Sequence, residues 1–281
     1  MEGTRHGTLW VVATPIGNLD DFAPRAIAVL RRVAVVAAED TRHSQVLLAR
    51  FAIATPAVAY HEHNERTMSD KLVARLLAGE DVALVSDAGT PTLSDPGYRL
   101  VRAAREAGVR VSTVPGPSAA VAALSVSGLA SDRFVFEGFL PARGAARRAR
   151  LEALRDDERT LVFYEAKHRI EETLADLVEA FGGERRAAIA RELTKLHETV
   201  LDGTLAALAE RVAGDAEQRL GEFVLVIAGA AGTDDEARRQ REGERVFALL
   251  AKELPAGKAA KLAAAITGAK RNALYRSGSE D

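Results

Sequence analysis

The stretch VSDAGTPTLSDPG, residues 85–97, is the most informative segment of the chain. Apolar residues lead into it, and it then holds two glycines, two prolines, two aspartates and four hydroxyl side chains. A simple connection between a strand and a helix usually takes about two to six residues. A loop that is this long, polar and stiffened by proline indicates a segment that holds a ligand.

Short apolar runs alternate with helical patterns over the first 126 residues. Strand patterns occupy residues 8–13, 33–38, 57–60, 81–86 and 109–114, and helical patterns occupy residues 24–32, 41–51, 68–78 and 98–107. Several strand patterns are apolar throughout, which is typical of strands that helices cover on both faces. The sequence therefore predicts an α/β domain with a mainly parallel sheet over residues 1–126.

A second set of strand patterns begins near residue 133. Strands are expected at residues 133–139, 160–165, 186–193, 198–203 and 221–229, and helices at residues 145–154, 170–181 and 205–212. These elements predict a second α/β domain over residues 127–231, joined to the first by VSGLASD at residues 126–132. Residues 232–281 are expected to form a polar linker and a small helical tail.

Composition excludes several classes of site. The chain has 281 residues, 47% of them apolar, a net charge of −2 and no cysteine. Disulfides, thiolate metal sites and cysteine nucleophiles are therefore excluded, and any contact with nucleic acid must come from local basic patches. No apolar run is long enough for a membrane span, so we expect a soluble, cytoplasmic protein. His61 and His63 alternate along a strand pattern without an evident third ligand, and no metal is expected.

Four unusual loops follow strands of the first domain. They read TPIGNLDD, EDTRHS, DAGTPTLSDPG and PGPSAA. In an open parallel sheet, ligands bind beyond the carboxyl ends of the strands, so these loops predict one site built largely from backbone groups. The chain has no glycine-rich dinucleotide fingerprint and no P-loop. Asp87 and Asp95 would repel a phosphate and suit a cation or a ribose hydroxyl.

The ordered motifs resemble a known family. They are TPIGNL, AEDTR, SDAGTPTLSDPG, PGPSAAVAAL with SGL, GFLP, FYEAKHR and ARELTKLHE. Together they are similar to the ribosomal small-subunit methyltransferase I family, S-adenosylmethionine-dependent 2′-O-methyltransferases of the tetrapyrrole-methylase superfamily. The resemblance implies a cytidine of the 16S rRNA decoding centre as target, two α/β domains with the cofactor in the cleft between them, and a homodimer. Lys167 departs from the family, which usually has proline there, and we expect only a local change of the turn.

The same resemblance assigns the cofactor loops. It implies that S-adenosylmethionine meets the backbone around Asp87, Ala88 and Gly89, with the turns after the first and fifth strands completing the pocket. The remaining residues of this predicted set are Pro15, Gly17, Pro115, Gly116, Ser118 and Ala119.

The candidates for chemistry are charged residues near strand ends. Glu39, Asp40 and Arg42 follow the second strand, and Glu192 and Lys195 come from the second domain. A ribose hydroxyl needs a base or a stabilising cation to become a good nucleophile, and these groups could supply either. Asp40 could instead cap a helix, and Glu192 with Lys195 could form an ordinary salt bridge. The sequence does not choose a base among the five.

Two basic clusters are candidates for RNA contact. The first is Arg143, Arg147, Arg148 and Arg150, with no acid in the same run, although a solvated helix face has the same composition. The second is Lys258, Lys261, Lys270, Arg271 and Arg276, in a tail whose pattern of helix, Thr-Gly turn and helix is typical of a helix-turn-helix or of a simple packing unit.

Three functions remain open at this point. The first is methylation of ribosomal RNA in the small ribosomal subunit. The second is methylation of a tetrapyrrole on the same fold, which would need no basic tail. The third is a role as an RNA-binding assembly factor without catalysis.

Overall fold

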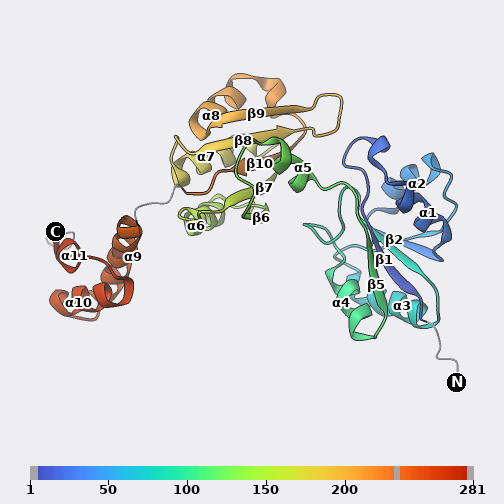
Figure 1. The fold of residues 1–281 in the computed structure, drawn as a ribbon, viewed down its shortest axis with the longest axis horizontal. Coiled ribbons are helices and arrows are strands. Elements are labelled where there is room, and N and C mark those ends of the chain that lie inside the picture. The colour runs from blue at the N-terminus through green and yellow to red at the C-terminus, as the bar shows by residue number, and fades with distance from the viewer. Residues whose placement is uncertain (1–5, 231–234, 277–281) are drawn as a thin grey trace.

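The structure is a computed structural model that describes residues 6–230 and 235–276, apart from the side chains of residues 235–238, 241, 275 and 276. Figure 1 shows two α/β units side by side, and a separate group of helices towards the C-terminus. Within the described ranges, no helix combines the length and the apolar character needed to cross a membrane.

The first unit is built on five parallel strands in the order β3-β2-β4-β1-β5. The strands are β1 (Thr8–Val12), β2 (Val35–Ala38), β3 (Ala57–Ala59), β4 (Val82–Val85) and β5 (Arg110–Val114). The connecting helices are α1 (Pro24–Arg32), α2 (Thr41–Arg50), α3 (Glu65–Leu77) and α4 (Tyr98–Glu106), with a short 3-10 helix η1 (Leu19–Asp21) after β1. The prediction of a parallel α/β sheet is confirmed.

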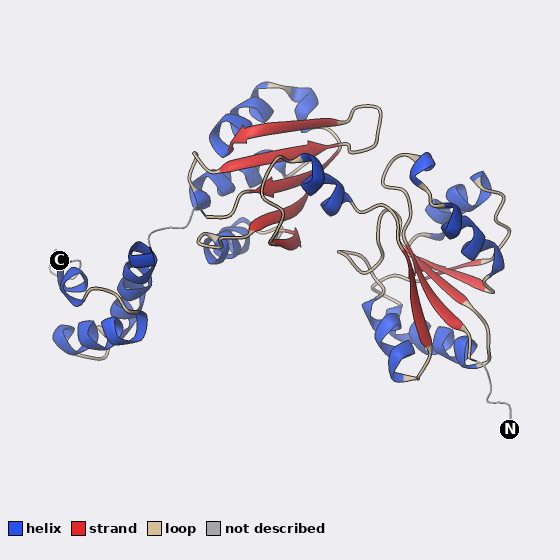
Figure 2. Cartoon of the chain, in the orientation of Figure 1, coloured by secondary structure: helices blue, strands red, loops and turns tan. Residues whose placement is uncertain are grey.

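Central strands of this sheet contribute side chains to two separate hydrophobic cores, because successive side chains of a strand point to opposite faces. Val36 of β2 packs with Leu30 of α1 on one face, and its neighbour Val35 packs with Leu72 of α3 on the other. Figure 2 shows helices on both sides of the sheet. Because both faces are covered, the carboxyl edge of the sheet is where its loops can build a site.

The second unit is built on a mixed sheet in the order β6-β7-β10-β8-β9. Its strands are β6 (Phe134–Phe139), β7 (Thr160–Ala166), β8 (Arg186–Arg191), β9 (Thr199–Thr204) and β10 (Glu222–Ile227). β6 and β7 pair in parallel, and the other neighbours pair antiparallel. One face packs against α6 (Gly144–Leu154), α7 (Ile170–Phe181) and α8 (Leu205–Gly214), and η2 (Ala216–Arg219) precedes β10.

The other face of the second sheet is covered by α5 (Ala119–Val126), a helix that the sequence analysis did not predict. Its Ala120 and Ala123 pack against Val162 and Val224 of the sheet. The helix is apolar on nearly every side, so it carries no amphipathic period by which it could be recognised. Because α5 packs with the second sheet, we propose that the domain boundary lies near residue 117 and not at residue 126.

Between residues 235 and 276, the tail forms the helices α9 (Asp235–Leu250), α10 (Ala256–Thr267) and α11 (Arg271–Arg276). They enclose a small core of their own, which includes Phe247, Ala259, Ala263 and Leu274. Gly268 ends α10 in the left-handed conformation at φ +73°, where the sequence predicted a turn. The predicted pair of helices around a Thr-Gly turn is confirmed.

The predicted polar linker is wrong from Asp235 onward, because α9 begins there. Charged and amide side chains on this helix lie three or four residues apart, and Gln240 bonds to Glu244 and Arg245 to Glu242. Gly243 of α9 lies against the tail core, and a Cβ added to it would overlap Ala269. Both features escape an analysis based on polarity alone.

Candidate functional site

A cavity of about 320 Å³ lies between the loops at the carboxyl edge of the first sheet and the second sheet. The loops after β1, β2, β4 and β5 all contribute to it, as predicted for the four unusual loops. The second unit contributes residues of β6, β7 and β10 and the segment that begins at the end of β8. The cavity is therefore lined by residues of both units.

Gly89 anchors the long loop after β4. Its φ of +79° lies in the left-handed region that favours glycine. The amide of Thr14 donates to Gly89 O at 2.8 Å, and the amide of Gly89 donates to Thr14 O at 3.1 Å. These two bonds fasten the loop to the end of β1, so Gly89 fixes the wall of the cavity.

Farther along the same loop, the backbone is held in unusual conformations. Thr92 and Ser94 have φ values of +77° and +66°, which residues other than glycine rarely adopt. Ser94 Oγ lies so close to Gly138 of β6 that a Cβ at Gly138 would have to displace it. This contact joins the loop to the second unit at the mouth of the cavity.

The first unit contributes three carboxylates to the cavity wall, those of Glu39, Asp87 and Asp95. The amide of Asp40 donates to Asp87 Oδ1 at 3.1 Å, which holds that side chain in place. Burial, reinforced by the neighbouring Asp95 and Asp87 carboxylates, raises the pKa of Glu39. Burial likewise raises the pKa of Asp95 to about 6, with a further contribution from Asp87. A cluster of this charge favours a cationic ligand and hydroxyl donors over a phosphate.

On the opposite wall, Lys195 forms a bridge between two carboxylates. Its Nζ donates to Glu192 Oε1 at 2.9 Å and to Glu222 Oε2 at 2.7 Å. Burial opposes the charge on Lys195, but these two bonds outweigh it and raise the lysine pKa. Burial also works against the charge on Glu192, yet the bonds from Lys195 and from the Glu222 amide lower the pKa of that carboxyl. Lys195 therefore stays protonated and Glu192 is a weak base.

The predicted cofactor residues divide into two groups. Asp87, Ala88, Gly89, Ser118 and Ala119 line the cavity. The other four, which do not line it, are Pro15, Gly17, Pro115 and Gly116.

Gly17 and Gly116 pack closely against neighbouring residues behind the cavity wall. Gly116 approaches Ala13 so closely that a Cβ there would lie 3.1 Å from the alanine methyl. Gly17 lies against the side chain of Lys195, and a Cβ there would overlap it. Ile16, between Pro15 and Gly17, is the residue of that loop that lines the cavity.

The predicted catalytic residues also divide. Glu39, Glu192 and Lys195 line the cavity, whereas Asp40 and Arg42 do not. Asp40 caps α2 by accepting from the Arg42 amide at 2.8 Å. Bonds from the Arg42 side chain and amide hold the pKa of Asp40 at about 2. The side chain of Arg42 is 89% exposed, and helix capping is the alternative that the sequence left open for Asp40. The catalytic role of this pair stays a prediction.

Most lining residues are absent from the predicted set, and three of them, Asp95, Phe139 and Tyr164, matter for the chemistry of the cavity. Asp95 could be recognised from the sequence, because it is a charged residue in the loop of residues 85–97. Phe139 and Tyr164 carried no signal that distinguished them from core aromatics in strand patterns. Their role depends on which strand face meets the first unit, and that is a property of the tertiary fold.

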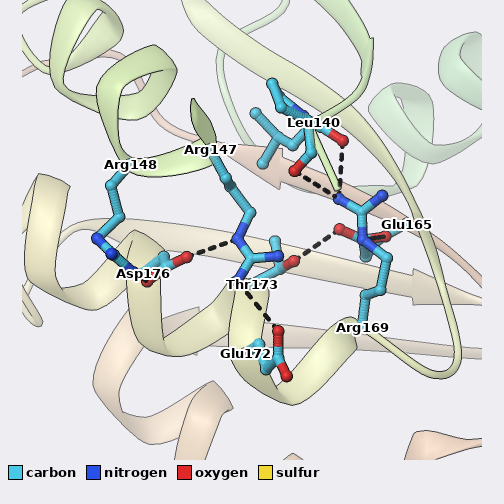
Figure 3. A network of polar contacts seen from close by, with 9 residues as sticks. Leu140, Arg147, Arg148, Glu165, Arg169, Glu172, Thr173 and Asp176 are labelled. Carbon is cyan, nitrogen blue, oxygen red and sulfur yellow. Dashed lines mark hydrogen bonds and ion pairs between the residues drawn. The ribbon is translucent and has the colours of Figure 1, made fainter. Parts of the chain in front are cut away.

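The first basic cluster is largely paired with acids. Arg147 is buried, and its guanidinium bonds to Asp176 and Glu172 of α7. Figure 3 shows this network, in which Arg148 also reaches Asp176. The prediction that Arg147 contacts RNA is wrong, because its charge is neutralised inside the second unit. Arg150 pairs with Glu137, to which its Nε and Nη2 donate at 2.7–2.8 Å.

Acidic residues of β6 and α7 therefore neutralise most of the arginines of residues 143–150, a segment that contains no acidic residue. Arg143, in the turn before α6, is exposed and keeps its place as a predicted RNA contact. Figure 3 also shows Arg169, which donates to Leu140 O at 2.7 Å and so ties the turn after β7 to the end of β6. Lys167, the departure from the family motif, is exposed in that turn.

The tail keeps its basic side chains in solvent. Lys258, Lys261, Lys270 and Arg271 are all exposed on α10, on α11 or between them. The side chain of Arg276 lies outside the described residues. Among the described residues, no group of three or more His, Cys, Asp or Glu side chains could hold a metal ion.

Comparison with known proteins identifies the family. Residues 8–209 match the model for Tetrapyrrole (Corrin/Porphyrin) Methylases, and residues 237–279 match the RsmI C-terminal HTH domain. The protein named Ribosomal RNA small subunit methyltransferase I in Xylella fastidiosa (strain Temecula1) is 61% identical over 96% of this chain and 98% of its own length. The chain belongs to the ribosomal RNA small subunit methyltransferase I family. It is therefore a methyltransferase.

Other members of the family extend this likeness. The proteins of the same name from Pseudomonas aeruginosa and Escherichia coli O157:H7 are 57% and 48% identical, each over 96% of this chain and 96% and 94% of their own lengths. The match to the HTH model also supports the helix-turn-helix pattern predicted for the tail.

Solved structures agree on the fold. The methyltransferase CobJ matches with a TM-score of 0.58 and 21% identity, over 80% of this chain and 95% of its own. Uroporphyrin-III C-methyltransferase from Thermus thermophilus, complexed with S-adenosylhomocysteine, matches with a TM-score of 0.54 and 20% identity, over 80% of this chain and 97% of its own. The two α/β units thus have the tetrapyrrole-methylase fold.

Proposed function

We propose that this methyltransferase transfers a methyl group from S-adenosylmethionine to the ribose 2′-hydroxyl of a cytidine in 16S rRNA, at the decoding centre of the small ribosomal subunit. The observation that carries the proposal is the 61% identity over 96% of the chain, tail included, to a protein named for small-subunit rRNA methylation. The choice of the 2′-oxygen and of a cytidine rests on the motifs in the sequence.

The cavity fits S-adenosylmethionine in chemistry. Glu39, Asp87 and Asp95 suit a ligand that carries a sulfonium, an ammonium and ribose hydroxyls. Ser118 Oγ is buried at the wall, where it can form a hydrogen bond with a ligand. We assign donor binding to these groups together with the backbone around Ala88 and Gly89. When bound, the donor supplies an electrophilic methyl group.

The residues of the cavity can also prepare the acceptor. Orientation of a hydroxyl towards the methyl carbon can supply about 7–11 kcal/mol in well-aligned cases. Burial makes Glu39 a stronger base than an ordinary glutamate, because its pKa is raised, and Asp95 shares that property. Either carboxylate could accept the hydroxyl proton, whereas Glu192 is committed to Lys195. Lys195 can stabilise negative charge that develops on the ribose oxygen.

Contact with RNA outside the cavity is assigned to the tail. Four exposed basic side chains of the helix-turn-helix, from Lys258 to Arg271, can bind phosphates without reading the bases. Arg143 can add a further phosphate contact near the second unit. The homodimer rests on the family resemblance, and sedimentation equilibrium of the purified chain tests it.

The decisive experiment uses small-subunit particles from a strain that lacks its own enzyme of this family. The protein is incubated with the particles and methyl-labelled S-adenosylmethionine, and the label is mapped by nuclease digestion and nucleoside analysis. A 2′-O-methyl group blocks alkaline cleavage of the adjacent phosphodiester, because the 2′-oxygen can no longer attack the phosphorus. We expect one labelled cytidine and one alkali-resistant bond.

Two other outcomes would replace the proposal. Label on a base, with normal alkaline cleavage at that position, would contradict ribose methylation. Particle binding without any transfer would favour a non-catalytic assembly factor. The carboxylates of the cavity would repel the acidic side chains of a tetrapyrrole, which argues against such a macrocycle as substrate.

A further inference from the structure

Phe139 places an exposed aromatic ring at the mouth of the cavity. It lines the cavity and is 54% exposed, although burial of an aromatic ring is strongly favourable. Leu93, on the loop after β4, also lines the cavity and is 41% exposed, and the next residue, Ser94, lies against Gly138, which precedes Phe139. Together Phe139 and Leu93 give the mouth an apolar rim above the carboxylates of the cavity wall.

The ring reaches this position because β6 contains a bulge. In a regular strand, Phe136 and Phe139 would point to opposite faces, since they are an odd number of residues apart. The pairing with β7 shifts between Phe136 and Gly138, which leaves Glu137 as the extra residue. Both phenylalanines therefore contact the same ring, that of Tyr164 on β7.

Tyr164 holds the exposed ring in place. Its centroid lies 4.9 Å from that of Phe136 and 5.6 Å from that of Phe139, with both pairs near edge-to-face. The Tyr164 hydroxyl accepts from the Ala120 amide at 3.2 Å, which fixes the tyrosine against α5. Phe139 is thus supported from behind, while more than half of its surface remains open.

We propose that Phe139 is the stacking platform for the base of the target nucleotide, an inference that rests on the proposed function. A nucleotide whose ribose reacts inside the cavity must leave its base stack, and extruded bases in protein sites stack on aromatic rings. The acidic wall repels phosphates, so the base and the sugar enter and the phosphates stay outside. The flat, apolar face of a base matches the ring of Phe139 and the rim at Leu93.

The first test compares kinetics of three variants. Phe139→Ala removes the ring, Phe139→Tyr keeps it, and Phe134→Ala removes an exposed ring from the same strand that does not line the cavity. From the cost of losing one base–aromatic stack, we expect Phe139→Ala to lower kcat/KM for the particle by about 5- to 150-fold. Phe139→Tyr and Phe134→Ala should stay near the wild type, and calorimetry should find donor affinity unchanged in all three.

The second test reports stacking directly. The chain has one tryptophan, Trp10, so Trp10→Phe combined with Phe139→Trp creates a single fluorescent reporter at position 139. We expect the particle RNA to quench this fluorescence and the donor alone to leave it unchanged. A matched protein with Trp10→Phe and Phe134→Trp should not respond to the particle.

The outcomes separate this proposal from the function on which it rests. A wild-type protein that transfers no methyl group overturns the proposed function, and the fluorescence measurement then still decides whether a base stacks at position 139. An active wild type with equal losses in Phe139→Ala and Phe134→Ala overturns the stacking role alone. A loss of donor affinity in Phe139→Ala that matches the loss of kcat/KM would assign the ring to the donor and also overturn it.

Discussion

Replacement of Gly89 should weaken donor binding through the backbone. A Cβ added at Gly89 would lie 3.4 Å from Ile16 Cγ2 and 3.9 Å from Pro117 O, which are ordinary contacts. The obstacle is therefore the φ of +79° and not a steric clash. For an L-residue the left-handed conformation costs roughly 1–2 kcal/mol, and a β-branched residue such as valine is a more severe outlier there.

The protein can meet this cost in two ways, and both are measurable. If Gly89→Ala keeps the conformation, the strain lowers the free energy of unfolding. If the backbone relaxes, it loses the paired bonds with Thr14, and the cavity wall moves. In the second case the backbone has to return to the native conformation to bind the donor. Because a tenfold change in Kd corresponds to about 1.4 kcal/mol, we expect Gly89→Ala to weaken S-adenosylmethionine binding by about tenfold. Gly89→Val should weaken it further.

Gly108 provides the matched control. It has a φ of +72° just beyond α4, no atom lies within 4 Å of an added Cβ, and it does not line the cavity. Gly108→Ala should therefore lower Tm by about 2–8 °C, as Gly89→Ala does, without changing donor affinity. Calorimetric titration and thermal unfolding of both variants are the assays. Wild-type affinity in Gly89→Ala and Gly89→Val would refute the role of this glycine in the donor site.

Three further predictions follow from buried and exposed charge. Asp95→Asn should raise Tm at pH 7 but not at pH 4, because the raised pKa of about 6 makes the contribution of Asp95 to stability fall as pH rises through 6. The affinity of the wild type for the donor should fall below pH 6, where the Asp95 carboxylate becomes protonated. Arg147→Met should cost about 3–5 kcal/mol in urea unfolding, since it leaves Asp176 buried with less compensation, whereas Arg148→Met should cost below about 1 kcal/mol. A chain cut after Ala230 should bind the donor normally but show a flatter dependence of particle binding on salt, and equal slopes with and without the tail would make it a packing element.

Much of the fold could be predicted because local patterns and tertiary structure agree. The helices predicted at residues 24–32 and 170–181 have the same bounds as α1 and α7, since each begins and ends where its amphipathic pattern does. The loop predicted to hold a ligand lines the cavity, and its glycines allow the positive φ angles found at Gly89 and Gly97. These signals lie within a few residues and need no knowledge of the rest of the chain.

The errors have the opposite character. The run around Arg147 reads as a basic patch, but its partners Asp176 and Glu172 lie on another helix, about thirty residues away in the sequence. Phe139 reads as a core strand residue, because a bulge cannot be recognised from a strand pattern. Charge neutralisation and the direction of a side chain are set by contacts between elements, so a local analysis has no access to them.

Strain is concentrated where the two units meet, and this links the errors to function. Five described residues other than glycine have positive φ values, and four of them lie in two segments that line the cavity: Thr92, Ser94, Glu192 and Thr194. Each such conformation costs roughly 1–3 kcal/mol and persists only where surrounding contacts enforce it. Ser94 lies against Gly138 of the opposite unit, and the side chain of Glu192 accepts a hydrogen bond from the Glu222 amide of the neighbouring strand. The site is therefore formed by assembly of the two units, which explains why neither segment on its own reveals the geometry.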